Sequence, residues 1–150
     1  MRGYFEIGVY HSKYEVNIGT LWRSAYQLGA AGIFTIGRRY DTQASDTTKP
    51  WRHIPLRHYQ SLEHMNESRP YGAMLVGIEM GGMPLAEFEH PERTIYLLGA
   101  EDHGLPDVVM AQCQHIVSLE SVRQASYNVA TAGTLVMYDR IFRIRKAVAR

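Results

Sequence analysis

The sequence has little of the chemistry that marks exported or membrane proteins. It has one cysteine, Cys113, which cannot form an internal disulfide and has no companions for a zinc site. No apolar run reaches 18 residues, and acidic Glu6 interrupts the first residues, where a signal peptide needs a continuous apolar stretch. We therefore expect a cytoplasmic protein that is neither exported nor embedded in a membrane.

The usual nucleotide and metal motifs are also missing. No G-x-G-x-x-G follows the first expected strand and no G-x-x-x-x-G-K-[ST] occurs, which removes the usual support for nicotinamide and P-loop nucleotide binding. None of the seven histidines pairs at metal-ligand spacing such as H-E-x-x-H, so we expect no metal. Ser126 lacks the G-x-S-x-G context of serine hydrolases.

The composition fits one globular domain over residues 1–150. A chain of 150 residues with 45% hydrophobic content can build a real core but leaves little room for two domains. The net charge of +1 conceals two basic clusters, at residues 38–58 and 140–150. Such clusters suit a polyanion held on one face, and the alternative is ordinary solvated surface charge.

The hydrophobic pattern alternates between strands and helices. An apolar strand at residues 4–10, a helix capped by Asn17 and ended by Gly29, and a strand at 33–36 make a βαβ unit, which predicts a parallel sheet. The other expected strands are an edge strand at 51–59 and strands at 72–78, 94–98 and 115–119, and the other expected helices cover 61–67, 107–114 and 128–147.

The stretch LLGAEDHGLPD, residues 97–107, is the strongest local signal for a ligand site. A buried strand ends there in Gly99, Gly104 repeats the backbone freedom of glycine, and Pro106 starts a helix. Ligands of open α/β sheets bind outside the carboxyl ends of strands, so we expect a small molecule at this loop. The alternative is a well-capped connection without a ligand.

Three segments together carry a resemblance to a known family. NIGTLWRSA at 17–25, LLGAEDHGLP at 97–106 and SYNVATAG at 126–133 resemble the three motifs of the SPOUT RNA methyltransferases, SpoU/TrmH branch. The resemblance implies a parallel-sheet α/β domain with a C-terminal trefoil knot that forms an S-adenosylmethionine pocket, and a homodimer as the active unit. It implies methylation of a ribose 2′-hydroxyl in RNA, and the absence of a visible accessory domain favours tRNA over rRNA.

The resemblance also assigns the site residues. The expected catalytic residues are Arg23, Asn17, Glu101, Ser126 and Asn128. The expected cofactor-binding residues are Ile78, Leu98, Gly99, Gly104, Val117, Leu119, Ser126 and Tyr127. The chain departs from the family pattern at Asp102 and His103, where a small residue and a variable one are usual.

The positively charged residues have two expected roles, in catalysis and in RNA binding. Guanidinium stays protonated, so Arg23 should orient the target phosphate and stabilise the developing alkoxide, with Glu101 fixing it through a bidentate pair. The expected RNA-binding residues are Arg38, Arg39, Lys49, Arg52 and Arg57, together with Arg143, Arg145 and Lys146 near the C-terminus.

Two other readings remain at this point. A non-catalytic RNA-binding α/β module would use the same basic clusters with Tyr40, Trp51 and Tyr59 as stacking aromatics. A small-molecule-binding domain would have no salt-dependent affinity for RNA. For Ile78, Val117 and Leu119, ordinary strand core is as good an interpretation as cofactor contact.

Overall fold

A single parallel sheet organises the chain. The computed structural model describes residues 3–40 and 53–148, and its six strands run in the order β3-β2-β1-β5-β4-β6 with every pair parallel. The strands are β1 Tyr4–Tyr10, β2 Gly32–Ile36, β3 Leu56–Tyr59, β4 Met74–Pro84, β5 Arg93–Leu98 and β6 His115–Ser118. The helices are α1 Glu15–Leu28, α2 Leu62–Ser68, α3 Asp107–Met110 and α4 Val129–Val148, with a 3₁₀ turn, η2, at Leu85–Glu87.

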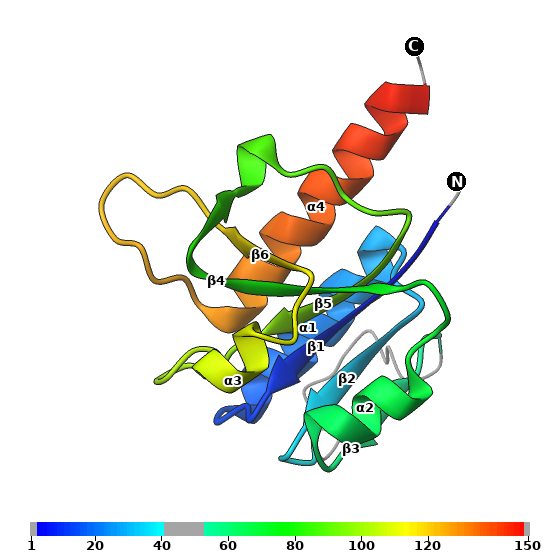
Figure 1. Ribbon diagram of the computed structural model, residues 1–150, viewed down its shortest axis with the longest axis vertical. Coiled ribbons are helices and arrows are strands. Elements are labelled where there is room, and N and C mark those ends of the chain that lie inside the picture. The colour runs from blue at the N-terminus through cyan, green and yellow to red at the C-terminus, as the bar shows by residue number, and fades with distance from the viewer. Residues whose placement is uncertain (1–2, 41–52, 149–150) are drawn as a thin grey trace.

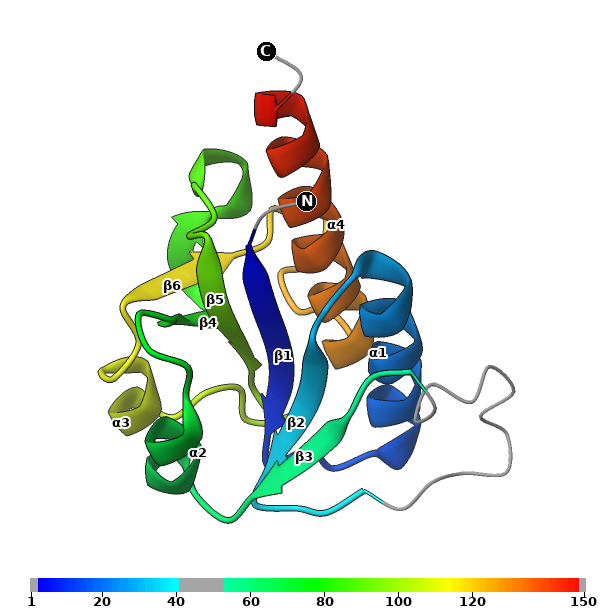
Figure 2. The same ribbon diagram turned by 90° about the vertical axis from the view of Figure 1, so that its right-hand side faces the viewer.

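Helices cover both faces of this sheet. Helices α1 and α4 lie on one face and α2 and α3 on the other (Figures 1 and 2). In β5 the side chains alternate between the two cores: Tyr96 and Leu98 pack toward α1 and α4, whereas Ile95 and Leu97 pack toward α2 and α3. Because the central strands are buried on both faces, most of their residues are apolar, as the sequence predicts for a parallel sheet, although β1 also buries Glu6 and β5 also buries Thr94.

Helix α1 begins two residues before its predicted cap. It starts at Glu15 after Tyr14, which has extended backbone and makes no side-chain cap, so Asn17 lies inside the first turn. The predicted end is confirmed, because Gly29 adopts φ 87° and its N–H donates to the carbonyls of Ala25 and Tyr26. The helix buries a stripe of apolar side chains at helical spacing, made up of Ile18, Leu21, Trp22 and Ala25, whereas Leu28 is only partly buried.

Three other predicted boundaries differ from the structure. Strand β4 continues to Pro84, with an irregularity in its pairing with β6 between Ile78 and Met83, where the sequence suggests a turn. Helix α3 ends at Met110 because Gln114 already pairs with the sheet: its N–H donates to the Leu75 carbonyl and its side-chain oxygen accepts from the Leu75 N–H. Strand β3 is an edge strand, as predicted, but it starts only at Leu56.

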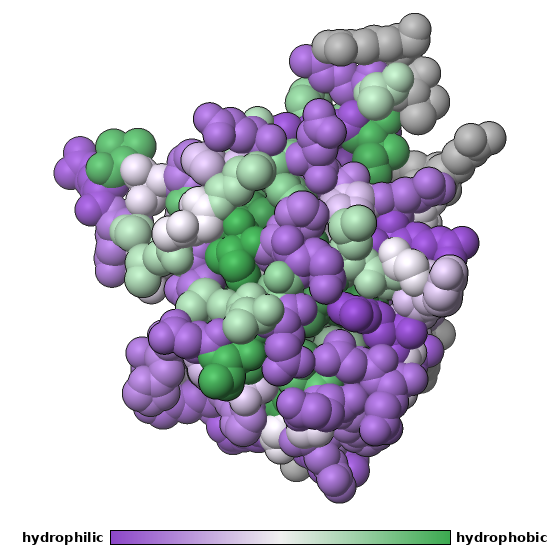
Figure 3. All heavy atoms as spheres, viewed as in Figure 1, coloured by the Kyte–Doolittle hydropathy of each residue, from purple (hydrophilic) through white to green (hydrophobic). Residues whose placement is uncertain are grey.

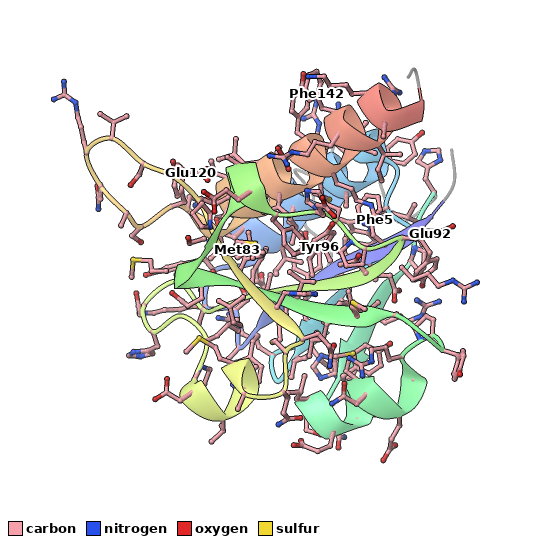
Figure 4. The ribbon with its side chains drawn as sticks, turned by 45° about the horizontal axis from the view of Figure 1, so that its top comes forward. Phe5, Met83, Glu92, Tyr96, Glu120 and Phe142 are labelled. Atoms are coloured by element: carbon pink, nitrogen blue, oxygen red, sulfur yellow. The ribbon has the colours of Figure 1, made fainter. Side chains whose placement is uncertain are left out.

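The arginines of α4 correct the interpretation of the C-terminal basic cluster. Arg140 is only 1% exposed and donates to the carbonyls of Pro91 and Glu92 and to the hydroxyls of Thr94 and Tyr96. Its guanidinium lies 5.0 Å from the centre of the Phe5 ring, and Figure 4 shows Phe5, Tyr96 and Glu92 close together near α4. Arg140 is therefore a structural residue that ties α4 to β5.

Arg143 is engaged in the same way. Its guanidinium donates to Asp139 and to the carbonyls of Phe88, Leu85 and Ala86, so it holds α4 against the segment around η2. Of the residues expected to bind RNA near the C-terminus, Arg145 and Lys146 stay exposed.

Candidate functional site

A pocket of about 220 Å³ lies at the carboxyl end of β5 and beside the middle of β4, where the sequence predicts a ligand. Its apolar part comes from Ile78, Leu98, Val129 and Ala132, and its polar part comes from the loop that follows β5. The remaining lining residues are Glu79, Met80, Gly99, Ala100, Glu101, Asp102, His103, Gly104, Leu119, Ala125, Ser126 and Tyr127.

All but one of the predicted cofactor-binding residues line this pocket. Those that do are Ile78, Leu98, Gly99, Gly104, Leu119, Ser126 and Tyr127. Val117 does not; it is fully buried in the core and pairs with Ile78 across β4 and β6. The strand-core alternative therefore describes the side chain of Val117.

The two glycines of the loop allow the backbone to fold back on itself. The Gly104 N–H donates to the Ala100 carbonyl over 3.0 Å, and a Cβ on Gly99 would lie 2.3 Å from the Gly104 carbonyl carbon. Gly104 itself has φ 64°, in the region that favours glycine. The tight loop thus brings backbone groups to the edge of the pocket.

Glu79 is a pocket residue that the sequence analysis missed. Its carboxylate accepts hydrogen bonds from the Leu105 N–H over 2.7 Å and from the Met80 N–H over 2.9 Å. The available signal was its place directly after the apolar part of β4, at the same sheet edge as Gly99. Glu79 thus places a carboxylate on the pocket wall, directly against the loop that follows β5.

Gly104→Ala should weaken ligand binding in this pocket more than Gly72→Ala does. A Cβ at Gly104 would lie 2.2 Å from a Glu79 carboxylate oxygen, so Glu79 must leave its position. Gly72 also has positive φ, at 76°, but a Cβ there meets nothing within 4 Å. Both variants carry a backbone cost of about 1 kcal/mol, and we expect only Gly104→Ala to weaken pocket binding, by about tenfold or more in calorimetry. Equal losses in the two variants would contradict this.

Three segments that are far apart in the sequence meet beside the pocket. Glu101 accepts a hydrogen bond from the Asn17 side-chain amide over 2.9 Å, and Asn17 accepts one from the Asn128 amide over 2.9 Å. Asn128 also caps α4 by accepting from the Thr131 N–H over 3.1 Å. The loop after β5, the start of α1 and the start of α4 are therefore held together by one polar chain of contacts.

Glu101 receives further hydrogen bonds from the loop after β1. The Lys13 N–H donates to it over 2.8 Å, and the Ser12 hydroxyl donates over 3.1 Å. Burial raises the pKa of Glu101, but the hydrogen bonds from Asn17 and from the Lys13 backbone outweigh burial and hold that pKa below its usual value. The Glu101 carboxylate is therefore ionised at neutral pH and acts as the acceptor at the centre of this network.

The predicted bidentate pair between Glu101 and Arg23 is wrong. Arg23 is exposed, and it does not line the pocket. Six residues at about 100° each turn Arg23 to a different side of α1 from Asn17, so the two side chains cannot both face the loop of their own chain. Among the other predicted catalytic residues, Ser126 lines the pocket and Asn17, Glu101 and Asn128 belong to the network.

The residues predicted to bind RNA are dispersed. Arg38 donates to the Lys13 carbonyl beside the loop, and Arg39 is exposed nearby. Arg57 forms an ion pair with buried Glu6 and is half exposed. Lys49 and Arg52 lie outside the described residues.

Neither a metal-binding cluster nor a membrane-spanning helix is found in the part of the chain that the structure describes. Within residues 3–40 and 53–148, no three His, Cys, Asp or Glu side chains gather in a way that could hold a metal ion. Over the same ranges no helix is long and apolar enough to cross a membrane.

Comparison with curated proteins finds RNA methyltransferases. The chain is 28% identical over 137 residues to 23S rRNA (uridine(2479)-2′-O)-methyltransferase of Streptomyces viridochromogenes, which covers 83% of this chain and 48% of that protein. It is 26% identical over 136 residues to mouse tRNA (guanosine(18)-2′-O)-methyltransferase TARBP1, covering 82% of this chain and 8% of that protein. The chain thus spans about half the length of the first relative and a small part of the second.

Solved structures share the fold. The SpoU methyltransferase AviRb from Streptomyces viridochromogenes, in complex with AdoMet, superposes with a TM-score of 0.86 at 22% identity, over 97% of this chain and 59% of that one. A structure titled "Structural insights into the 2-OH methylation of C/U34 on tRNA" gives 0.82 at 24% identity, over 99% of both chains. The predicted parallel α/β fold is confirmed by these likenesses. The family model described as "SpoU rRNA Methylase family" matches residues 5–138, and the chain therefore belongs to that family.

Proposed function

We propose that this protein is an RNA methyltransferase that uses S-adenosylmethionine to methylate a ribose 2′-hydroxyl. The observation that carries the proposal is the joint position of the pocket and the polar network. The pocket is lined by most of the predicted cofactor residues, and the network of Asn17, Glu101 and Asn128 joins all three family segments beside it.

The residues of the pocket fit this cofactor. Ile78 and Leu98 provide apolar surface for an adenine ring, and the tight loop between Gly99 and Gly104 brings backbone groups close enough to bind polar edges. A sulfonium is a cation, and the Glu79 carboxylate on the pocket wall favours a positive charge there. S-adenosylmethionine supplies an electrophilic methyl group when it is bound.

The protein's own contribution is positioning and charge. Methyl transfer to an oxygen is an in-line displacement, so the acceptor oxygen must be held in line with the methyl group and the sulfur. Another group must accept the proton of the hydroxyl. The network around Glu101 fixes the loop and the starts of α1 and α4 as one unit. Arg23 is exposed and does not line the pocket of its own chain, so its role is proposed from the family resemblance alone: it would orient the target phosphate and stabilise the developing alkoxide, with the proton passing to phosphate or water.

Isothermal titration calorimetry with S-adenosylmethionine tests the pocket assignment. We expect one cofactor per chain, and weaker binding in the Gly104→Ala variant than in Gly72→Ala. A protein that is folded by circular dichroism and shows no heat of binding would remove the cofactor assignment and with it the proposed reaction.

The substrate is proposed to be tRNA rather than rRNA, in the cytoplasm. The relatives named above include enzymes for both kinds of RNA. We propose that residues 1–150 form one SPOUT-type methyltransferase domain, and the support for tRNA is the likeness, over 99% of both chains, to the structure that concerns methylation of C/U34 on tRNA. The trefoil knot remains part of this proposal, and it is supported by family membership and by the fold likeness.

We further propose that the active unit is a homodimer. Apolar side chains of residues 128–137 are mostly buried within the chain, so the exposed apolar stripe lies further along α4 than the sequence suggests. Leu135, Tyr138 and Phe142 are 41%, 62% and 56% exposed at helical spacing, beside a groove that includes Leu85 and Leu119. Phe142 lies near the C-terminal end of α4 (Figure 4), and on the face that Figure 3 draws, hydrophobic residues form groups separated by hydrophilic ones.

Light scattering should therefore give twice the 17.1 kDa mass of the chain. The double change Tyr138→Glu with Phe142→Glu should give a monomer, because it places two charges in the apolar stripe. Val108→Glu is the matched control, since Val108 is 72% exposed on α3, on the other face of the sheet. A monomeric wild-type protein, or dissociation in the control as well, would argue against this interface.

A further inference from the structure

A second hollow lies next to the cofactor pocket. It has a volume of about 540 Å³ and is lined by His11, Ser12, Lys13, Gly37, Arg38, Ala100, Asp102 and His103. Ala100, Asp102 and His103 line both cavities, so a single loop separates the hollow from the cofactor pocket.

The ends of β1 and β2 shape this hollow. Tyr10 and Ile36 are register partners, and the His11 N–H donates to the Ile36 carbonyl over 2.8 Å. His11 then turns with φ 54°, which is rare for a residue other than glycine, and its ring covers Gly37. A Cβ on residue 37 would lie 2.7 Å from that ring, so the hollow requires glycine there.

Two cationic side chains, Lys13 and Arg38, and one carboxylate, Asp102, line the hollow. Lys13 Nζ lies 2.6 Å from an Asp102 carboxylate oxygen, and this hydrogen bond raises the pKa of Lys13, so the ammonium stays charged. Both partners are about half exposed. Arg38 donates to the Lys13 carbonyl, which places its guanidinium beside the same loop. An anion at this place would therefore meet an arginine fork and a lysine together.

We propose that this hollow binds a phosphodiester group of the RNA strand next to the acceptor ribose, through Lys13 and Arg38. The inference rests on the proposed function and extends it to the substrate. An acceptor oxygen has to come within about 3.5 Å of the transferred methyl group, so the ribose lies at the mouth of the cofactor pocket. Every internal ribose has a phosphate on each side, and the hollow is the neighbouring space with cations.

The chemistry of the lining supports a phosphodiester. A guanidinium binds phosphate oxygens through two N–H groups, and an ammonium acts as a point charge beside it. Asp102 has a different part: its carboxylate competes with phosphate for Lys13 and lowers the affinity for the anion. Asp102 and His103 are also among the positions at which this chain departs from the family pattern.

Methyl transfer to RNA at several salt concentrations tests the proposal. The substrate is total RNA from cells that lack this protein, and the rate is measured with labelled S-adenosylmethionine at low RNA concentration. For Lys13→Gln and for Arg38→Gln we expect a KM for RNA raised about tenfold and a plot of log rate against log salt that is flatter by about 0.7. The affinity for S-adenosylmethionine, measured by calorimetry, should change less than about twofold.

Three further variants separate charge from structure. Arg38→Lys keeps the charge and should restore the salt slope, whereas loss of a purely structural contact would not be rescued in that way. Asp102→Asn should lower the KM for RNA and steepen the slope, because it removes the competing carboxylate. Arg93→Gln is the control, because Arg93 is exposed at the amino end of β5, whereas the hollow lies at the carboxyl ends of the strands. This variant should leave the KM for RNA and the salt slope unchanged.

The outcomes for the two proposals differ. If the wild-type protein binds S-adenosylmethionine and methylates RNA, but Lys13→Gln and Arg38→Gln keep its salt slope and its KM, the hollow is not a phosphate site. If Arg93→Gln flattens the slope equally, the effect belongs to general surface charge and the inference is wrong. If the wild-type protein transfers no methyl group at all, the proposed function fails and this inference falls with it.

Discussion

Glu101→Gln should reduce methyl transfer by about a hundredfold or more and destabilise the fold by about 2 kcal/mol. The carboxylate accepts hydrogen bonds from the Asn17 amide, the Ser12 hydroxyl and the Lys13 N–H. A glutamine of the same shape has only one acceptor oxygen, and its own N–H groups would face one of these donors. Hydrogen bonds to a charged acceptor are worth about 1.5 to 3 kcal/mol each, so the loss is large for so small a change.

Thermal unfolding and labelled methyl transfer measure the two effects of Glu101→Gln. Glu87→Gln is the matched control, because Glu87 is exposed on η2 and away from the network. A Glu101→Gln protein with the stability and rate of the control would show that the network is incidental. Because the pKa of Glu101 is lowered in the fold, its stabilising contribution is present above the ordinary glutamate pKa and is lost as pH falls through the lowered value.

Arg23→Ala should abolish turnover, with a loss of about a thousandfold, while leaving the affinity for S-adenosylmethionine nearly intact. Arg23 is exposed on α1 and does not line the cofactor pocket, so its removal takes nothing from the bound cofactor. An arginine that stabilises the developing alkoxide acts mainly in the transition state, and the loss should therefore fall on kcat.

Arg23→Lys separates geometry from charge at the same position. Lysine keeps the positive charge but loses the planar fork, so we expect turnover to remain at least about tenfold below the wild-type rate. Single-turnover kinetics and calorimetry on one preparation give the rate and the cofactor affinity. Wild-type turnover in Arg23→Lys, or a loss of cofactor binding in Arg23→Ala, would contradict the role assigned here.

The local sequence pattern predicts element boundaries correctly where local and tertiary preferences agree. Strand β1 has its predicted bounds because a central parallel strand is largely apolar, and α1 ends at Gly29 because this residue adopts the left-handed backbone that closes the helix. The predicted start of α1 was wrong because Asn17, a residue type that often caps helices, uses its side chain to donate a hydrogen bond to Glu101, 84 residues away. Such a contact leaves no trace in the neighbouring sequence.

Burial of charge was the other part that the sequence could not predict. Arg140 looks like one member of a basic C-terminal cluster, but it is almost fully buried among the carbonyls and hydroxyls around the start of β5. Composition shows the charge of a residue, whereas its surroundings depend on how α4 crosses the sheet. The same reason explains why Arg57, bound to Glu6, could not be told apart from freely exposed arginines.

For the site, the resemblance brought the correct segments together but did not give their contacts. Asn17, Glu101 and Asn128 do meet, although the expected partner of Glu101 was Arg23. Glu79 was missed because it belongs to none of the three motif segments and reaches the pocket only through the pairing of β4 with β5. The spacing of residues along the chain cannot show which partner a side chain contacts in the folded protein.

Mass-spectrometric mapping of ribose methylation in RNA from cells with and without this protein tests the central claim most directly. The account predicts one or a few 2′-O-methyl groups that are present in the tRNA of cells with the protein, absent without it, and absent again when the cells carry Arg23→Ala. RNA with identical ribose methylation in all three strains would contradict the proposed activity and would favour the non-catalytic RNA-binding module. A methyl group found on a base instead of a ribose would contradict the proposed reaction.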